Sequence, residues 1–337
     1  MNVLVTGGAG YIGSAVAEEL VDNGCHVIVL DNLQQGHRDA IPAKANFVLA
    51  DIGDTTTLEH ILQQFGITAV MHLAADSLVG ESMTDPGKFF QNNVANGLVL
   101  LNTMLKNGVR KFVFSSSAAV YGNPETIPIP EDHPKSPVNA YGDSKLTFER
   151  ILEWYGLAYD LQYISLRYFN AAGATLLSGE AHHPETHLIP NILRAALNGS
   201  SSVPVFGTDY STKDGSCIRD YIHVADIAKA HFMALEKLDG LRAKAYNLGN
   251  GNGYSVLEVI ETARRLTGAD IHVKFCSRRA GDPGILVASS DLARTEMGWT
   301  PKFELEAIIE SAWKWMLRHP GGYGSRESKP AAIGGRV

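Results

Sequence analysis

The sequence predicts an α/β fold, with a doubly wound parallel sheet and a smaller mixed α/β lobe. Three observations lead to this prediction. Short apolar runs alternate with amphipathic stretches through the first half of the chain, as in sheets built from βαβ units. A glycine-rich turn directly follows the first apolar run. After residue 168 the alternation gives way to loops and shorter elements, which indicates a second architecture.

Composition bounds the class of protein. The 337 residues are 45% apolar and 19% charged, which is typical of a globular chain with one large unit or two closely packed lobes. A net charge of −7 gives no reason to expect a nucleic acid or an acidic membrane as partner. The three cysteines form no CxxC pair, and the chain has no leader-like or membrane-spanning apolar stretch. We therefore expect a cytoplasmic protein with reduced thiols.

The first 31 residues predict the opening βαβ unit of a Rossmann-type fold. The apolar run 3–5 stops at the segment Thr6–Ser14, which reads TGGAGYIGS. An amphipathic stretch then reaches Gly24, and a second apolar run, 27–30, ends at Asp31. This order of strand, glycine-rich turn, helix, strand and acid indicates a dinucleotide site.

The glycines and the acid of this unit have separate roles. Gly7, Gly10 and Gly13 follow GxxGxxG spacing, which permits a tight turn, close backbone approach to a pyrophosphate and close helix–strand packing. The following helix N-terminus offers free N–H groups and a positive dipole to the phosphates. Asp31 can accept hydrogen bonds from both ribose hydroxyls and repels a 2′-phosphate. The pattern therefore favours NAD over NADP.

The alternation continues to residue 168. Asp51 and Ile52, at the tip of the third strand, are placed to meet an adenine edge, and the small Ala74 and Ala75 let a cofactor lie close to the backbone. We expect His72 to be a hydrogen-bonded strand-end histidine and not a ligand. The predicted elements are strands 47–51, 69–73, 111–114 and 161–166 and helices 57–65 and 92–107.

Hydroxyl, phenol and ammonium groups are predicted to meet at the carboxyl edge of the sheet. The strand 111–114 runs into Ser115–Ser117, and strand C-termini line the ligand crevice in such sheets. Asn139 can cap a helix that carries Tyr141 and Lys145 on one face. A nearby cation lowers the pKa of a phenol and makes it a useful general base. On spacing alone a chance pair is the commoner explanation, and the surrounding motifs decide against it.

Beyond residue 168 we expect a lobe made of non-contiguous pieces. The predicted division is a cofactor-binding domain over 1–168 with returning segments at about 207–250, a substrate lobe mostly within 169–323, and a disordered tail at 324–337. The predicted loops are 173–187 and 207–216, and the predicted helices are 225–235, 255–266 and 305–317.

Three histidines in the first of these loops, His182, His183 and His187, suggest a metal site at first sight. Metal ligation needs further donors, and the sequence offers no second cluster of carboxylates or thiolates to accompany them. We therefore expect no metal.

Together, the TGGAGYIGS segment, Ser117 and the pair Tyr141-x3-Lys145 resemble the extended short-chain dehydrogenase/reductases. Within them, the chain is similar to the UDP-glucose 4-epimerase family over nearly its whole length, to about Tyr323. The stretches that carry this resemblance are 31–33, 79–82, 92–94, 166–170, 187–190, 206–210, 219–224, 246–251 and 278–282.

The resemblance implies a role for each matching residue. Tyr141 is the catalytic base and acid, Lys145 lowers its pKa and bonds the nicotinamide ribose, and Ser117 bonds the sugar 4-oxygen. The residues expected at NAD are Gly7, Gly10, Tyr11, Ile12, Gly13, Asp31, Asn32, Asp51, Ile52, Leu73, Ala74, Ala75, Asn92, Ser115, Tyr141, Lys145 and Phe169. Those expected at the UDP-sugar are Ser117, Tyr141, Asn170, His187, Leu188, Phe206, Arg219, Tyr221, Arg279 and Asp282.

The implied activity is interconversion of UDP-galactose and UDP-glucose through a 4-keto sugar with tightly bound NAD, in a homodimer that pairs the helices near 92–107 and 140–158. Two departures from the family pattern stand out. Ala119 replaces a usual Thr, and Leu286 stands where some members carry a pocket-narrowing Tyr. The second leaves activity on UDP-GalNAc and UDP-GlcNAc open.

Two other functions compete with this one. A 4,6-dehydratase or reductase would share the fold, but dehydratases place an acid/base pair just after the central-strand hydroxyl, where this chain has Ala118 and Ala119. A non-catalytic NAD(H)-sensing regulator has no reason to keep Ser117, Tyr141 and Lys145 together.

Overall fold

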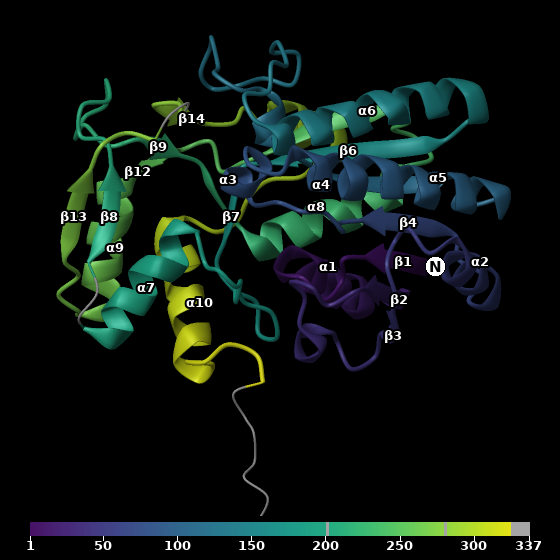
Figure 1. Cartoon of the computed structure of the whole chain (residues 1–337), viewed down its shortest axis with the longest axis horizontal. Helices are drawn as coiled ribbons and strands as arrows, with labels where there is room; N and C mark the ends of the chain where they lie inside the picture. Colours follow the sequence, from purple (N-terminus) through teal and green to yellow (C-terminus); the bar gives the residue numbers. More distant parts are fainter. Residues whose placement is uncertain (200–201, 280–281, 325–337) are drawn as a thin grey trace, which may run out of the picture.

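In the computed structural model of this chain, residues 1–199, 202–279 and 282–324 are described, and they form a larger and a smaller part that lie side by side (Figure 1). The larger part is built on a seven-stranded parallel sheet of order β11-β6-β5-β4-β1-β2-β3. Its strands are β1 (Asn2–Thr6), β2 (His26–Asp31), β3 (Asn46–Leu49), β4 (Ala69–His72), β5 (Lys111–Ser117), β6 (Gln162–Tyr168) and β11 (Lys244–Leu248).

Helices cover both faces of this sheet, which is why its strands are almost continuously apolar. Val3 and Val5 of β1 face a core with one group of helices, and Leu4 faces the core on the other side, because successive side chains of a strand alternate. The helices on the first face are α1 (Tyr11–Asp22) and α8 (Val224–Lys237); those on the second are α2 (Thr55–Gln64), α5 (Gly97–Lys106) and α6 (Ala140–Tyr159). The predicted fold class is therefore confirmed.

The helix predicted over 92–107 is not continuous. A short α4 (Pro86–Phe90) leads into a π-helical segment, Gln91–Asn96, before α5 begins. Asn93 explains part of this, because its side chain bonds backbone atoms of Asp76 and the hydroxyl of Ser144 on α6. Polar side chains with tertiary partners here override simple helical periodicity.

The smaller part contains short strands and three longer helices, seen on the left of Figure 1. Its parallel pairs are β7 (Asn170–Ala172) with β10 (Tyr221–His223) and β8 (Val203–Phe206) with β13 (Val273–Cys276). A third sheet places β9 (Ile218–Arg219) between β12 (Tyr254–Ser255) and β14 (Ile285–Leu286). The helices are α7 (Leu188–Asn198), α9 (Val256–Thr267) and α10 (Leu305–Arg318).

Most expected elements are present within a few residues of their predicted bounds. The sequence interpretation missed α7, although Ile189, Ile192 and Leu193 give it a buried apolar stripe. Most of the tail predicted to be disordered lies outside the described residues. Among the described residues, no helix combines the length and the apolar character needed to cross a membrane.

His72 is a hydrogen-bonded strand-end residue, as predicted. Its Nδ1 lies 2.7 Å from Thr6 Oγ1, and burial lowers its pKa to about 3. The unfolded chain therefore binds more protons than the folded chain between about pH 3 and the ordinary histidine range. We expect the free energy of unfolding to fall as the pH drops below about 6.5. Urea unfolding at several pH values checks this; an unchanged slope in His72→Asn would contradict a contribution from His72.

Candidate active site

The glycine-rich loop joins β1 to α1, and its backbone is packed too closely to allow side chains at two of its glycines. A Cβ added at Gly7, where φ is 72°, would lie 2.5 Å from the Ala74 nitrogen, and one at Gly13 would lie 2.0 Å from the Gly7 carbonyl oxygen. A Cβ on Gly10 would meet nothing nearer than 3.3 Å. No side chain caps the start of α1. The loop is thus pressed against the end of β4, and the helix N–H groups remain for an anion.

Asp31 stands at the tip of β2, beside this loop. Its two carboxylate oxygens accept hydrogen bonds from the backbone nitrogens of Ala9, at 3.0 Å, and Leu33, at 2.8 Å. Each oxygen keeps a second lone pair, which is what two ribose hydroxyls require. Asn32 donates to Asp51 at 3.0 Å, joining the tip of β2 to the segment after β3.

Two further residues predicted at the cofactor, Ile52 and Asn92, lie in different environments. The side chain of Ile52 is 3% exposed and packs in the core on the α2 and α5 side of the sheet. Asn92 donates to the carboxylate of Asp76 at 3.1 Å, beyond the end of β4.

Ser117, Tyr141 and Lys145 come together at the carboxyl end of β5. Asn139 caps α6 by accepting from the Gly142 nitrogen at 2.8 Å, as predicted, so Tyr141 lies in the first turn. The Lys145 ammonium lies 5.8 Å from the centre of the Tyr141 ring and donates to the Ser115 carbonyl oxygen at 2.9 Å. Ser117 Oγ accepts a hydrogen bond from the Ala119 nitrogen at 3.2 Å. The backbone of residue 119 therefore contacts Ser117 although the Thr hydroxyl usual at that position is missing.

The electrostatics of this trio differ in one respect from the expectation. Burial raises the pKa of Tyr141, and a hydrogen bond with Ser117 acts in the opposite direction. Burial also lowers the pKa of Lys145 to about 7, with Glu149 opposing. Removal from water therefore dominates both groups, and the pKa of Tyr141 is raised where a lowering by the neighbouring ammonium was expected.

Residues predicted for a diphosphate meet at the crevice side of the smaller part. Arg219, on β9, forms a close ion pair with Asp282. Asp282 in turn donates its backbone N–H to the Arg279 carbonyl oxygen at 3.3 Å. The Arg279 guanidinium stacks 4.0 Å above the ring of Phe206. The fold thus brings Arg219 to the carboxylate of Asp282, a residue whose backbone is hydrogen-bonded to Arg279.

Other residues predicted at the sugar nucleotide connect the two parts. Leu286 is paired with Arg219 in the β14–β9 register and also packs, with Phe169, on a cluster that includes Leu146 of α6. It therefore lies between α6 and an arginine of the smaller part. Of the remaining predicted residues, Asn170 opens β7 and His187 precedes α7. Leu188 and Tyr221 pack in the core of the smaller part.

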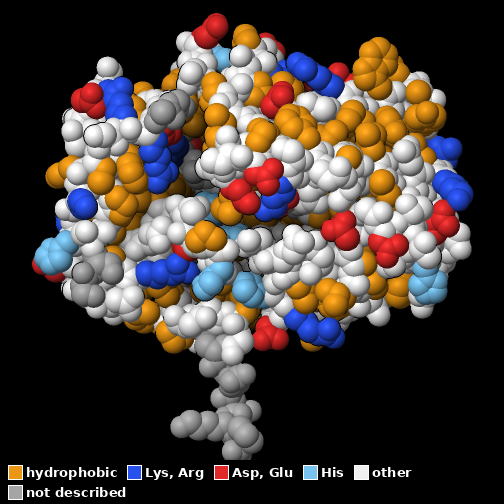
Figure 2. Space-filling view, viewed as in Figure 1, with side chains coloured by type: hydrophobic (Ala, Val, Ile, Leu, Met, Phe, Trp, Pro, Cys, Tyr) orange, Lys and Arg blue, Asp and Glu red, His pale blue; other side chains and the backbone are white. Residues whose placement is uncertain are grey.

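The space-filling view shows the surface hollowed between the two parts, with basic side chains on the wall of the smaller part (Figure 2). The carboxyl ends of the parallel strands face the same region, as expected where an α/β sheet binds its ligand.

Comparison with known proteins decides the family. Residues 3–249 match the model of the NAD dependent epimerase/dehydratase family. The chain belongs to this family. It is 51% identical over 334 residues to a Halalkalibacterium halodurans protein described as UDP-glucose 4-epimerase, covering 98% of this chain and 99% of that one.

Solved structures agree. A crystal structure of UDP-glucose 4-epimerase is 48% identical, with a TM-score of 0.93, and covers 96% of this chain and 99% of that chain. The Brucella ovis UDP-glucose 4-epimerase in complex with NAD is 43% identical, with a TM-score of 0.90, 93% of this chain and 98% of that one being covered. The predicted family and the NAD cofactor are confirmed.

The residues of this family member fit NAD. The glycine loop leaves room only for a ligand that approaches the backbone, and α1 begins without a cap. Asp31 keeps acceptors for hydroxyls but would repel a phosphate. The small Ala74, which touches Gly7, lets a cofactor continue along the end of β4.

The sequence interpretation missed a buried network behind the epimerase/dehydratase site. Glu149 receives two hydrogen bonds from Arg167, at 2.8 and 2.6 Å, and one from Ser116 at 2.5 Å. Arg167 also donates to the Tyr121 hydroxyl at 2.9 Å. These bonds join β5, β6 and α6 directly beneath Lys145. One signal was present in the sequence, because Glu149 lies one helical turn beyond Lys145 and on the same face.

Proposed function

We propose that this chain is a UDP-glucose 4-epimerase, which interconverts UDP-galactose and UDP-glucose through a 4-keto sugar. The observation that carries the proposal is the meeting of Ser117, Tyr141 and Lys145 at the end of β5, in a chain 51% identical to a protein of that name. The crevice between this trio and the arginines of the smaller part suits a sugar joined to a diphosphate.

In the proposed reaction Tyr141 removes the proton of the C4 hydroxyl and later returns it, while the Ser117 hydroxyl holds the C4 oxygen. NAD, when bound beside this trio, would supply the hydride chemistry at C4. The Lys145 ammonium, held by the Ser115 carbonyl oxygen, stabilises the phenolate form of Tyr141. A raised pKa for Tyr141 suits the return step, in which the phenol must donate.

The grip on the substrate is proposed to be uneven. Arg219 and Arg279 hold the diphosphate with bidentate hydrogen bonds. The sugar side has fewer charged contacts, with Leu286 and Phe169 as neighbours. A sugar held only through its nucleotide could present either face of C4 to the cofactor site, and in both orientations Tyr141 would return the proton to the C4 oxygen.

Incubation with UDP-galactose, without added NAD, tests the proposal. We expect UDP-glucose, with no net change in the redox state of the protein. A 4-keto-6-deoxy product would favour the dehydratase alternative. Retention of NAD without any turnover of the UDP-sugar would favour the regulator.

Leu286 is proposed to set the size limit at the sugar. We expect the parent to turn over UDP-GlcNAc and UDP-GalNAc, and Leu286→Tyr to lose this activity about tenfold or more, since overpacking costs about 1–3 kcal/mol. Turnover of UDP-galactose should change little. Steady-state kinetics with both substrate pairs checks this, with the volume-conserving Leu286→Met as control. Equal losses on both pairs would contradict a selective role.

A homodimer is also proposed, through the outer face of α6. Trp154 and Leu157 are 70% and 80% exposed there, and neighbouring apolar side chains with such exposure are typical of protein–protein contact sites. We expect equilibrium ultracentrifugation to give twice the mass of the 36.4 kDa chain, and Leu157→Glu to shift it toward monomer. Phe275→Glu, at an apolar side chain on β13 that is 59% exposed, serves as control. A monomeric parent would refute the dimer.

A cytoplasmic location is proposed as well. It is supported by Cys25, Cys217 and Cys276, all of which are free thiols.

A further inference from the structure

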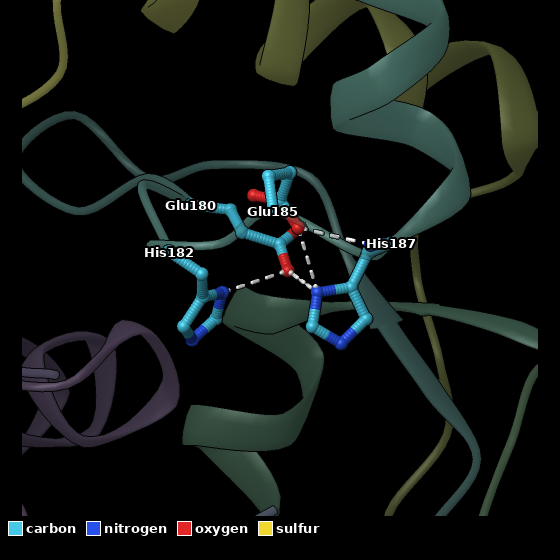
Figure 3. A group of neighbouring side chains, drawn as sticks. All are labelled: Glu180, His182, Glu185 and His187. Carbon is cyan, nitrogen blue, oxygen red and sulfur yellow. Dashed lines mark hydrogen bonds and ion pairs between the residues drawn. The ribbon is translucent and has the colours of Figure 1, made fainter. Parts of the chain in front are cut away.

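The loop between β7 and α7 brings four metal-ligating side chains to one point. They follow the spacing Glu180-x-His182-x2-Glu185-x-His187, and one donor atom from each lies within 4.8 Å of the others. Figure 3 shows both imidazoles turned toward the Glu180 carboxylate, with Glu185 beside it. Although the sequence shows no second cluster of carboxylates to accompany the histidines, the same loop supplies two, Glu180 and Glu185.

The cluster is built around buried carboxylates. The side chains of Glu180 and Glu185 are 7% and 1% exposed. Nδ1 of His187 lies 2.6 Å from Glu180 Oε1 and 3.0 Å from Glu185 Oε1. Nδ1 of His182 approaches the same Glu180 oxygen at 3.3 Å. Two imidazole nitrogens thus point at one carboxylate oxygen.

One ligand atom of this cluster, the buried Glu185 Oε2, lacks a hydrogen-bond partner among the described residues, and His182 Nδ1 has only its 3.3 Å contact with Glu180. Arg194 approaches Glu185 Oε2 only to 3.9 Å. A buried pair of carboxylates needs about two positive charges nearby, because unpaired buried charge is expensive. A divalent cation with neutral imidazoles supplies both charges and gives Glu185 Oε2 a partner.

We propose that Glu180, His182, Glu185 and His187 bind a divalent transition-metal ion of the Zn²⁺ type. Two imidazole nitrogens and two carboxylate oxygens form a donor set suited to Zn²⁺ and less suited to Mg²⁺ or Ca²⁺, which prefer oxygen alone. Tetrahedral Zn²⁺ with bonds near 2.0–2.1 Å places its donors about 3.3 Å apart. The shortest contact is 2.6 Å, so binding requires His187 and Glu180 to separate slightly.

The site is structural and not catalytic. The ring of His182 lies edge-on to Tyr11 of the glycine-rich loop, with centroids 6.3 Å apart, and His37 contacts the Ala181 carbonyl oxygen at 2.9 Å. His187 immediately precedes α7. An ion here would tie the loop of the smaller part to α7 at the point where that loop meets the cofactor-binding part.

Protons are the competing occupant. Burial acts to lower the pKa of His187, but Glu180 outweighs it and raises that pKa to about 10. A protonated His187 between two carboxylates can therefore hold the cluster together without an ion, and the experiment must separate the two occupants.

The test is zinc binding by the tag-free full chain after treatment with a chelator. Stoichiometry is measured by elemental analysis after dialysis, and affinity by competition with a chromophoric chelator. We expect one equivalent, with affinity reduced at least about tenfold in His182→Ala and in Glu185→Gln. The neighbouring His183→Ala and the double variant Cys25→Ser/Cys276→Ser should bind like the parent. Diffraction at the zinc edge should place an anomalous peak among the four side chains.

Either of two results would overturn the site. One is a parent that binds no more zinc than His182→Ala, which leaves protons as the only occupant. The other is equal loss in His183→Ala, which would mean adventitious histidine binding. Circular dichroism of the metal-free variants verifies that they fold. The readout uses neither UDP-sugar nor NAD, so it stands or falls separately from the proposed epimerase activity.

Discussion

Tyr141→Phe is expected to reduce epimerase turnover by about 10²–10⁴-fold, the usual contribution of a positioned general acid/base. The phenol oxygen is the group proposed to take and return the C4 proton, and Phe keeps the aromatic ring at this position of α6. Because the arginines of the smaller part are untouched, UDP binding should remain close to that of the parent. Turnover of UDP-galactose and calorimetric titration with UDP measure the two effects separately.

Tyr155→Phe is the matched control on the same helix. Its hydroxyl bonds Asn102 at 2.8 Å, on the exposed side of α6, and has no proposed role in the chemistry. We expect near-parent turnover for it. Near-parent turnover in Tyr141→Phe would reject Tyr141 as the proton carrier, whereas loss of UDP binding together with turnover would indicate a disturbed crevice.

Glu149→Gln is expected to lower the free energy of unfolding by about 3–5 kcal/mol, the usual effect of removing one partner of a buried ion pair. The side chains of Arg167 and Glu149 are 4% and 6% exposed, so the remaining guanidinium would have neither water nor a carboxylate. Denaturant unfolding of parent and variant gives the difference. The loss should also loosen the base of the site, because Ser116 and Lys145 contact or face the same carboxylate.

Two control variants distinguish the effect of breaking the Glu149–Arg167 pair from that of removing any carboxylate on α6. Glu153→Gln changes an exposed carboxylate on α6 and should leave stability within about 0.5 kcal/mol. The double variant Glu149→Met/Arg167→Met removes both charges and should recover much of the stability. A loss below about 1 kcal/mol in Glu149→Gln would contradict the importance assigned to this pair.

The sequence by itself determined the features that depend on local chemistry. The order of apolar run, glycine-rich turn and Asp31 predicts the opening βαβ unit. The structure shows why glycine is needed there, because a Cβ on Gly7 or Gly13 would clash with backbone atoms. The cap at Asn139 and the spacing of Tyr141 and Lys145 are likewise helical properties readable in one dimension. These predictions depend only on residues that are close together in the sequence.

The tertiary structure alone decided what distant segments do to one another. Arg167 and Glu149 become a buried pair only because β6 lies beside β5 under α6, and Arg219 meets Asp282 only because β14 pairs with β9. Desolvation, which raises the pKa of Tyr141 and lowers that of Lys145, depends on surrounding atoms from many segments and has no local signature. The same holds for Glu180 and Glu185, ordinary loop carboxylates in the sequence that folding buries against two histidines.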